Sequence, residues 1–215
     1  MTNTSSAKDY DAWYDTPRGA WISQSEFDLI RPMLQPQAGE SLLDVGCGTG
    51  HFSRRFARLG LRVSGIDPDA AAVDFAIAQG DDIGYFIGDG HTLPFPDQSF
   101  DYCVAVTSLC FVADVESVIK EMWRVSRKSV LLGLLNRNSL LFLQKAGGGG
   151  YAGARWDHPG NVKRWVKALP QQPKNIQIKT AVFLPRGKFL SRLIERLVPS
   201  SIPLGAFISV TLQKP

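Results

Sequence analysis

The sequence predicts an α/β protein with a mostly parallel sheet and helices on both of its faces. Short apolar segments alternate with amphipathic ones from about residue 40 to residue 136, an order that builds a parallel sheet with crossover helices. A glycine-rich turn follows the first apolar segment, and a carboxylate stands near the end of each of the first three. The 215 residues, 44% hydrophobic and 20% charged, have the composition of an ordinary globular domain.

Seven strands are expected. The first five are short apolar runs that end near glycine, aspartate or asparagine, or run into a loop, and the last two show alternation or a long apolar run. The expected strands span residues 40–47, 61–69, 83–90, 100–112, 128–136, 176–183 and 204–214. A loop with two prolines, residues 92–99, separates the third strand from the fourth.

Helices are expected where apolar residues recur every three or four positions. Residues 49–59 place Phe52 and Phe56 on one face and three arginines on the other. Asp69 is a suitable N-cap for the next helix, and Gly80 is a suitable stop. The expected helices span residues 49–59, 70–80, 114–127, 161–169 and 187–198, with a further helix inside residues 1–36.

The last third of the chain breaks the alternation. Four consecutive glycines, residues 147–150, predict a flexible loop or hinge. The helix expected at 187–198 carries an apolar face, with basic side chains mostly opposite. The apolar residues are Phe189, Leu190, Leu193, Ile194 and Leu197, and the basic ones are Lys188, Arg192 and Arg196. We expect this face to pack on the sheet or cover a ligand, and an interfacial helix at a membrane is the alternative.

The net charge of +4 is unevenly distributed. Residues 1–119 carry a net charge of −10 and residues 120–215 a net charge of +14. The basic half suits an acidic substrate, a membrane surface or nucleic acid, or it neutralises the acidic half across the folded surface. Nucleic acid is disfavoured because the basic residues are not interleaved with aromatic ones. A small-molecule partner is favoured over a membrane surface.

The cysteines and the N-terminus point to an intracellular protein. Cys47, Cys103 and Cys110 show neither metal-ligand spacing nor a disulfide framework, so no metal site is expected. The N-terminus is polar and acidic, without the apolar core of a signal peptide. No apolar run approaches the roughly 20 residues that cross a bilayer. We therefore expect a cytoplasmic protein, of undetermined oligomeric state.

The glycine turn, "LLDVGCGTGHF" at residues 42–52, indicates a nucleotide-like ligand, because small residues let a ligand approach the backbone at a helix N-terminus. A phosphate-binding P-loop requires Gly-Lys-Ser/Thr, but His51 follows Gly50 here. A dinucleotide fingerprint places its third glycine one position later than this sequence does. S-adenosylmethionine is the third candidate.

Four motifs together resemble the class I S-adenosylmethionine-dependent methyltransferases, in particular the methyltransferase type 11 domain group. They are "LLDVGCGTG", "VSGIDPD", "GDGHTLPFPDQSFDY" and "CVAVTSLCFV", in the family's order over residues 40–135. The closing strand "PLGAFISVTLQK" is also similar to the family's. The resemblance implies a Rossmann-like, seven-stranded sheet with an antiparallel C-terminal strand.

The resemblance implies one methyltransferase domain over residues 1–215. Its parts are an aromatic N-terminal lid and helix at 1–36, a cofactor-binding core at 40–136, a variable acceptor-site insertion at 137–170, and C-terminal strands with an amphipathic helix at 175–215. The expected function is transfer of a methyl group from S-adenosylmethionine to a small-molecule acceptor by in-line displacement. The alternatives are a lipid- or quinone-like acceptor at a membrane surface, or a non-catalytic cofactor-binding protein.

The resemblance places S-adenosylmethionine, and its product S-adenosylhomocysteine, at the carboxyl ends of the first four strands. Asp67 would accept hydrogen bonds from the ribose hydroxyls, Asp89 from the adenine amino group and Asp44 from the ligand ammonium. Tyr14 or Trp13 would face the sulfonium cation or its carboxylate neighbourhood, and Arg18 would pair with the methionine carboxylate. The expected cofactor-binding residues are Tyr14, Arg18, Asp44, Gly46, Cys47, Gly48, Gly50, Asp67, Pro68, Asp89, Gly90 and Thr107.

The acceptor side is less defined. Trp13, Ser108, Trp156 and His158 are the expected acceptor-site residues. No catalytic residue is assigned, because the neutral thioether leaving group makes alignment of the nucleophile the main requirement. A general base is needed only where the acceptor must lose a proton. The methylated atom, whether O, N, C, S or As, stays open.

Overall fold

One seven-stranded sheet forms the centre of the molecule. The computed structural model describes residues 6–187 and 189–215, so residues 1–5 of the expected N-terminal lid lie outside the described residues. The strand order is β3-β2-β1-β4-β5-β7-β6. The strands are β1 Ser41–Val45, β2 Arg62–Asp67, β3 Gly84–Ile87, β4 Phe100–Val106, β5 Ser126–Leu135, β6 Asn175–Ala181 and β7 Phe207–Gln213.

The pairing confirms the predicted Rossmann-like sheet with an antiparallel C-terminal strand. β1 to β5 pair in parallel, while β7 runs antiparallel to both β5 and β6. The chain winds outward from β1 to β3 and then from β4 to β6 on the other side. The winding reverses between β1 and β4, and ligands of open α/β sheets bind at the carboxyl ends of the strands at this point.

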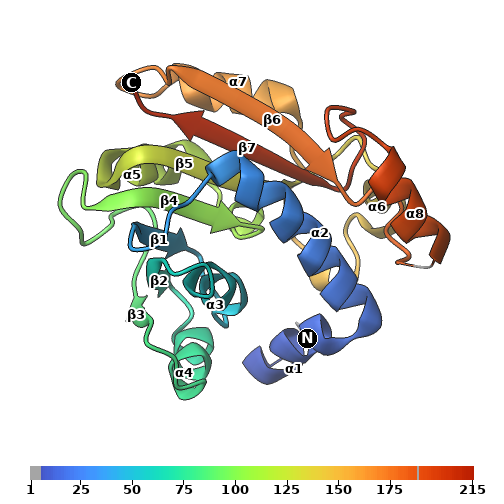
Figure 1. Ribbon diagram of the computed structural model, residues 1–215, viewed down its shortest axis with the longest axis horizontal. Coiled ribbons are helices and arrows are strands. Elements are labelled where there is room, and N and C mark those ends of the chain that lie inside the picture. The colour runs from blue at the N-terminus through green and yellow to red at the C-terminus, as the bar shows by residue number, and fades with distance from the viewer. Residues whose placement is uncertain (1–5, 188) are drawn as a thin grey trace.

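Helices cover both faces, as predicted (Figure 1). α2 and α3 pack on one face with Leu42, Val104 and Phe207, and α5 and α7 pack on the other with Leu43 and Ile208. The helices are α1 Ala7–Asp15, α2 Pro17–Leu34, α3 His51–Ala57, α4 Ala70–Ala78, α5 Val115–Val125, α6 Leu140–Lys145, α7 Pro159–Lys167 and α8 Phe189–Leu197. Two 3-10 turns, η1 Leu109–Phe111 and η2 Gly149–Tyr151, lie in loops.

Four elements differ from the sequence-based expectation. The N-terminal segment forms two helices, because Thr16 caps α2 and Pro17 occupies its first turn. The segment expected as one strand at 100–112 stops at Val106 and continues as η1. α6 was not expected, and part of the glycine run forms η2.

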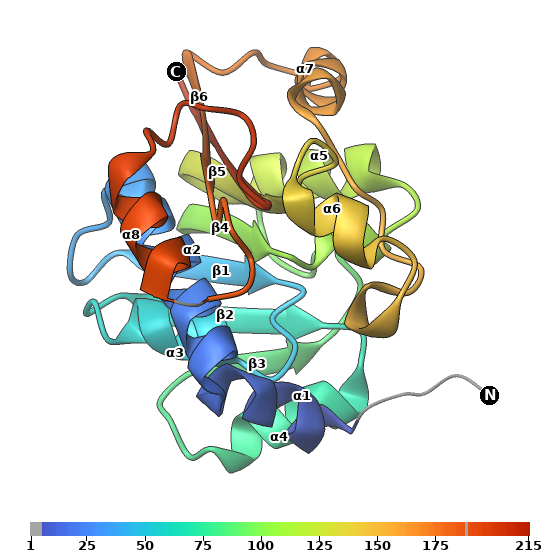
Figure 2. The same cartoon turned by 90° about the vertical axis from the view of Figure 1, so that its right-hand side faces the viewer.

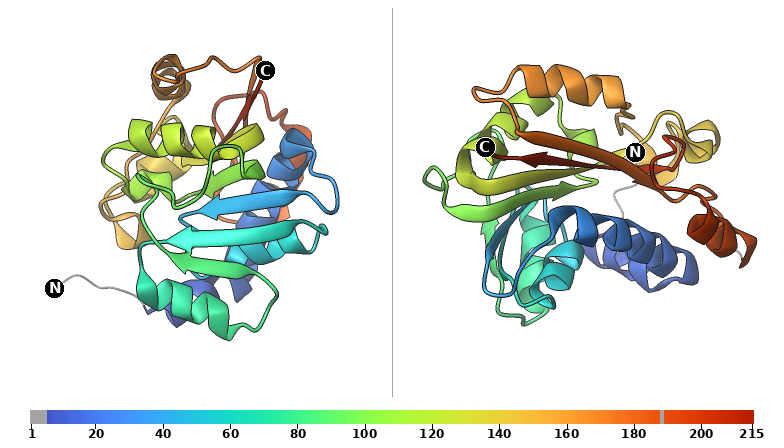
Figure 3. Two further views of the ribbon diagram at one scale, coloured as in Figure 1. Left: turned by 90° about the vertical axis from the view of Figure 1, so that its left-hand side faces the viewer. Right: turned by 45° about the horizontal axis from the view of Figure 1, so that its top comes forward.

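Helix α8 exposes the apolar side chains of Phe189, Leu193 and Leu197, contrary to the packing we expected. Phe189 is 84% exposed and Leu197 71%, while Ser191 is buried. The Glu195 carboxylate explains this orientation, because it accepts hydrogen bonds from the backbone N–H groups that follow β6, at 2.6 and 2.9 Å. Figure 3 shows α8 at the outer edge of the molecule. Lys188 and the side chain of Leu190, part of the expected faces, lie outside the described residues.

No helix in the described part of the chain has both the length and the apolar character needed to cross a membrane.

Candidate functional site

The three glycines of the turn between β1 and α3 do not all have the same structural role. Gly46 and Gly50 have φ of 71° and 79°, and a Cβ atom at either would lie 2.4 Å from a side-chain atom, of Ser108 or Tyr85 respectively. Close packing therefore requires both glycines. Gly48 also has a positive φ, 52°, but a Cβ atom there would meet nothing within 4 Å. Only at Gly48 does the backbone border open space.

Asp67, at the end of β2, holds this turn in place. Its Oδ2 accepts a hydrogen bond from the Gly48 N–H at 2.8 Å, and its Oδ1 accepts one from the Asp69 N–H at 2.9 Å. Burial raises the pKa of Asp67. A carboxylate offers about four acceptor positions, so two remain for a ligand. Pro68, between the two aspartates, is exposed.

Asp44 lies beneath the turn. It is 2% exposed and accepts a hydrogen bond from the Ser53 hydroxyl at 2.6 Å. Burial raises its pKa to about 7, and the negative charge of Asp67 adds to the rise. A cationic ligand group near Asp44 would favour its charged form. The Cys47 side chain points elsewhere, into the apolar cluster with Val73 and Tyr85.

The turn after β3 carries Asp89, Gly90 and His91. Asp89 is exposed, and its Oδ1 accepts hydrogen bonds from the backbone N–H of His91 at 2.9 Å and from its ring Nδ1 at 2.5 Å. These bonds lower the pKa of Asp89. Its second oxygen has no hydrogen-bond partner in the described part of the chain.

The turn after β4 is strained. Thr107 has a φ of 52°, a left-handed conformation that is unfavourable for a β-branched residue. Its N–H donates to the carbonyl of Gly133 at 2.9 Å. Strain of this kind concentrates at functional sites. Ser108 donates its hydroxyl to the Val45 carbonyl at 2.8 Å and packs against Gly46, so its side chain supports the glycine turn.

Helix α1 is fixed to the glycine turn by Asp11, a residue that sequence analysis missed. Its carboxylate accepts a hydrogen bond from the Thr49 hydroxyl at 2.7 Å and pairs with Arg54 at 3.2 Å. Figure 2 shows α1 next to α4, at the end of the sheet where the turn lies. The Tyr14 ring stacks on His51 at 3.6 Å, and Trp13 contacts Tyr14 edge-on. The aromatic segment is thus packed on the start of α3.

His51 is neutral, and its ring is held in place by a hydrogen bond to Ser23 and by stacking on Tyr14. Burial lowers its pKa to about 4, and the positive charge of Arg55 adds to the effect. Its Nε2 lies 2.6 Å from the Ser23 hydroxyl, whose oxygen accepts from Arg55 at 2.6 Å. Ser23 therefore donates its own proton to Nε2, which leaves the His51 proton on Nδ1. This chain of hydrogen bonds ties α2 to α3 beneath Tyr14.

Arg18 lies apart from the glycine turn. Its Nε donates to the carbonyl oxygen of Pro185 at 2.7 Å, and it lines a pocket with Lys145 and Arg186. The pocket contains none of the strand-end residues. No hydrogen bond joins the Arg18 side chain to another expected cofactor residue in the described part of the chain.

The segment of residues 137–170, the expected acceptor-site insertion, is fastened to the turn after β4 by an ion pair that sequence analysis missed. Asp157 is fully buried and bonds to Arg155 at 2.9 Å. Arg155 also donates to the carbonyl oxygens of Val112 and Leu109, at 2.6 and 2.9 Å. Asn161 gives Asp157 a further hydrogen bond at 3.2 Å. The only sequence signal was the isolated Asp157 in a basic region.

Trp156 and His158 flank this ion pair and have different surroundings. Trp156 packs against Tyr151 and Phe142, each with ring centroids 5.4 Å away. Its buried Nε1 has no hydrogen-bond partner among the described residues. The His158 ring accepts a hydrogen bond from the Gly160 N–H at 3.0 Å and caps α7, which gives it a structural role.

Glu26 is a further buried carboxyl group that sequence analysis missed. It lies on the inner face of α2 and is 8% exposed. Burial raises the pKa values of Tyr10, Tyr14 and Tyr151, and the charge of Glu26 adds to each rise. Burial raises the pKa of Glu26 to about 8, and Arg55 opposes the rise only in part. Strongly shifted carboxyl groups concentrate at functional sites.

The substitution Glu26→Gln is expected to stabilise the protein by about 2 kcal/mol at pH 6. The folded pKa of about 8 lies above the ordinary 4.5, so between these values the unfolded chain loses a proton that the folded chain keeps. The free energy of unfolding of the wild type therefore falls as pH rises through this window. Urea denaturation at pH 4 and pH 6 measures the difference, which should vanish at pH 4. Exposed Asp74→Asn should show no such difference.

No cluster of His, Cys, Asp or Glu that could hold a metal ion occurs among residues 6–187 and 189–215.

A family model described as a methyltransferase domain matches residues 43–132. A malonyl-[acyl-carrier protein] O-methyltransferase from Yersinia pestis is 37% identical over 172 residues, which are 79% of this chain and 60% of that protein. A ubiquinone/menaquinone biosynthesis C-methyltransferase from a Caulobacter species is 30% identical over 132 residues, 55% of this chain and 52% of that protein. This chain thus spans less than two thirds of the length of these relatives.

A structure from Thermotoga maritima, described as a SAM-dependent methyltransferase and possible histamine N-methyltransferase, covers 97% of this chain and 96% of its own, with a TM-score of 0.75 and 25% identity. The fold, the reversal of winding between β1 and β4, and the glycine turn together define an open α/β protein with a site for a nucleotide-like ligand. With the matching domain, they assign the chain to the class I S-adenosylmethionine-dependent methyltransferases.

Proposed function

We propose that the protein transfers the methyl group of S-adenosylmethionine to a small-molecule acceptor. The carrying observation is the set of turns at the carboxyl ends of four adjacent strands, with α1 fixed beside the first by Asp11. Asp67 supports ribose binding, because its oxygens keep free acceptor positions next to the open face of Gly48. The missing Lys-Ser/Thr pair argues against a triphosphate.

The reaction requires alignment more than acid–base chemistry. The methyl carbon carries a neutral thioether as its leaving group, and positioning the acceptor in line with the C–S bond supplies roughly 7–11 kcal/mol of the barrier. A hydroxyl or amine acceptor must also lose a proton. We propose Glu26 as the group that accepts this proton, because it is buried on α2 and burial raises its pKa to about 8. The rise of kcat with pH should then be lost in Glu26→Gln.

Calorimetric titration with S-adenosylmethionine and S-adenosylhomocysteine tests the cofactor. We expect both to bind, and Asp67→Asn to weaken binding about tenfold, roughly 1.4 kcal/mol, because an amide keeps only one acceptor oxygen. Asp74→Asn, which removes an exposed carboxylate on α4, is the matched control and should bind normally. No binding of either ligand at millimolar concentration refutes the proposal. An assay with radiolabelled S-adenosylmethionine and a panel of small-molecule acceptors then measures transfer of the labelled methyl group.

A lipid-like acceptor at a membrane surface is the second candidate, and the orientation of α8 favours it. Phe189, Leu193 and Leu197 are exposed on α8, and Leu143 is 78% exposed on α6. Exposed apolar side chains beside basic ones are typical of helices that lie at a membrane interface. If this candidate is right, the protein should float with anionic vesicles, and the double variant Phe189→Ser/Leu197→Ser should no longer do so. A protein that stays in the soluble fraction contradicts it.

A further inference from the structure

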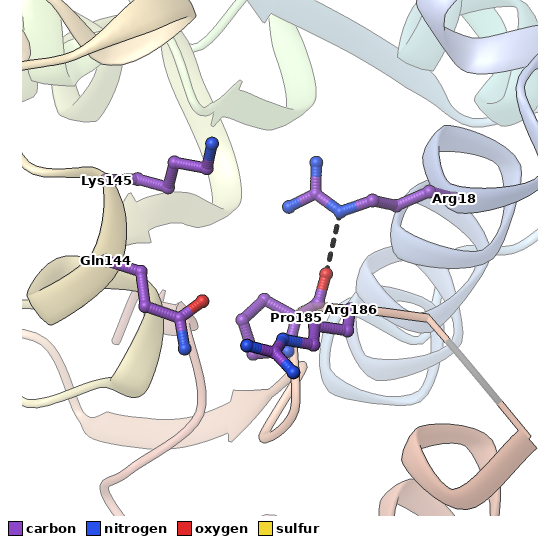
Figure 4. Close-up of a pocket in the computed structure, with 5 residues that line it drawn as sticks. All are labelled: Arg18, Gln144, Lys145, Pro185 and Arg186. Atoms are coloured by element: carbon purple, nitrogen blue, oxygen red, sulfur yellow. Dashed lines mark hydrogen bonds between the residues drawn. The ribbon is translucent and has the colours of Figure 1, made fainter.

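A basic pocket of about 630 Å³ lies between the start of α2, the end of α6 and the loop after β6 (Figure 4). Its lining residues are Arg18, Gln144, Lys145, Pro185 and Arg186. They come from three segments that are far apart in the sequence. The pocket is separate from the strand-end turns, because it shares no residue with them.

Three cationic side chains surround this space. The hydrogen bond from Arg18 Nε to the Pro185 carbonyl oxygen, 2.7 Å long, orients the Arg18 guanidinium. Figure 4 shows the Lys145 ammonium across the same space from that guanidinium, with the Gln144 amide and Arg186 on its remaining sides. The terminal nitrogens of Arg18 are left as donors toward the pocket.

Nothing in the described chain balances these charges. No carboxylate lines the pocket, and none of its three cations belongs to an ion pair of residues 6–187 and 189–215. Other cations, such as Arg124 and Lys128, are paired with acidic side chains. Cations gathered around one space repel one another, and a bound anion relieves that repulsion.

The donors suit a phosphate group better than a single carboxylate. Two guanidinium groups, one ammonium and one amide can address three oxygens at once, and arginine binds phosphate through paired hydrogen bonds. The space is open and large enough for a phosphate that stays attached to a larger molecule.

The pocket adjoins the expected acceptor side through helix α6. Gln144 and Lys145, at the end of this helix, line the pocket, and Phe142 of the same helix packs on Trp156 with ring centroids 5.4 Å apart. The Tyr151 ring packs on Trp156 as well. A ligand whose phosphate lies beside Arg18 could therefore extend past α6 toward Trp156, an expected acceptor-site residue.

We propose that this pocket binds a phosphate group carried by the methyl acceptor, a proposal that rests on the methyl-transfer function above. The phosphate belongs to a soluble phosphorylated molecule or to a lipid headgroup, and the same donors serve both. Arg18 and Lys145 then set acceptor specificity without contacting the cofactor.

Calorimetry with inorganic phosphate, at constant ionic strength and with and without S-adenosylmethionine, tests the proposal on the full chain. The test variant is Lys145→Ala/Arg186→Ala, since both side chains are exposed and make no hydrogen bond in the described chain. The matched control is Lys163→Ala/Lys167→Ala, which removes two exposed charges from α7. A second arm replaces phosphate with phosphatidylcholine vesicles containing phosphatidic acid.

We expect the test variant to weaken phosphate or phosphatidic acid binding at least tenfold, and the control to change it less than twofold. Affinity for phosphate without affinity for the vesicles identifies a soluble acceptor, and affinity for the vesicles identifies a lipid headgroup. Binding to neither, or equal loss in both variants, overturns the proposal. Cofactor affinity should be the same in all three proteins, so failure of cofactor binding is a separate result that refutes the methyl-transfer function instead.

Discussion

Replacing Gly48 with alanine is expected to weaken S-adenosylmethionine binding about 100-fold or more, roughly 2.7 kcal/mol, in a protein that stays folded. The new Cβ meets no protein atom within 4 Å, so the substitution does not disturb packing. It enters the space where the proposed ligand lies against the backbone. The φ of 52° adds a strain of roughly 1–2 kcal/mol to the folded state.

Gly39→Ala separates strain from ligand contact. Gly39 also has a positive φ, 84°, and open space around its Cα, but it lies in the turn before β1. Both variants should lose similar stability in urea, and only Gly48→Ala should lose cofactor affinity in calorimetry. Equal affinities would mean that Gly48 serves the turn alone and that the ligand lies elsewhere.

Asp157→Ala should lower the free energy of unfolding by about 3–4 kcal/mol. The variant leaves the Arg155 guanidinium partly buried, without its carboxylate, and removes the hydrogen bond from Asn161. Because Arg155 also holds the carbonyls of Leu109 and Val112, the turn after β4 should loosen. Urea denaturation measures the stability, and a kinetic assay should show a higher KM for the acceptor with nearly unchanged cofactor affinity.

Arg164→Ala is the comparison for this ion pair. Arg164 pairs with Glu116 at 3.4 Å on the surface, where its side chain is 69% exposed, and such pairs contribute about 0–1 kcal/mol. A loss in Asp157→Ala no larger than in Arg164→Ala would show that the buried pair does not hold the insertion.

The fold could be predicted from the sequence because its signals are local. Apolar runs, the glycine turn and the cap at Asp69 each act within a few residues, and the structure confirms the strands and helices they indicated. The direction in which α8 faces was not predictable. Its apolar stripe is clear in sequence, but Glu195 bonds to backbone groups at the end of β6 and holds the stripe outward.

The positions of the candidate residues at the strand ends could also be predicted, because these residues adjoin their strands, while their contact with the cofactor stays a prediction. Asp11, Arg155 and Glu26 were missed because each acts on segments distant in the sequence. An aspartate in a polar N-terminal helix has no local feature that links it to Thr49. Nor does a single glutamate on an amphipathic helix reveal that folding will bury it.

The sequence by itself determined the sheet and its strand-end turns, because backbone geometry at Gly46, Gly48 and Gly50 and the chemistry of Asp67 are properties of short segments. Its four motifs also carried the resemblance that implies the methyl donor. Only the tertiary structure decided what gathers around the proposed acceptor site. Burial sets the pKa of Glu26, and three distant segments place Arg18, Lys145 and Arg186 around one space. Burial and convergent charge arise from folding, so no local pattern encodes them.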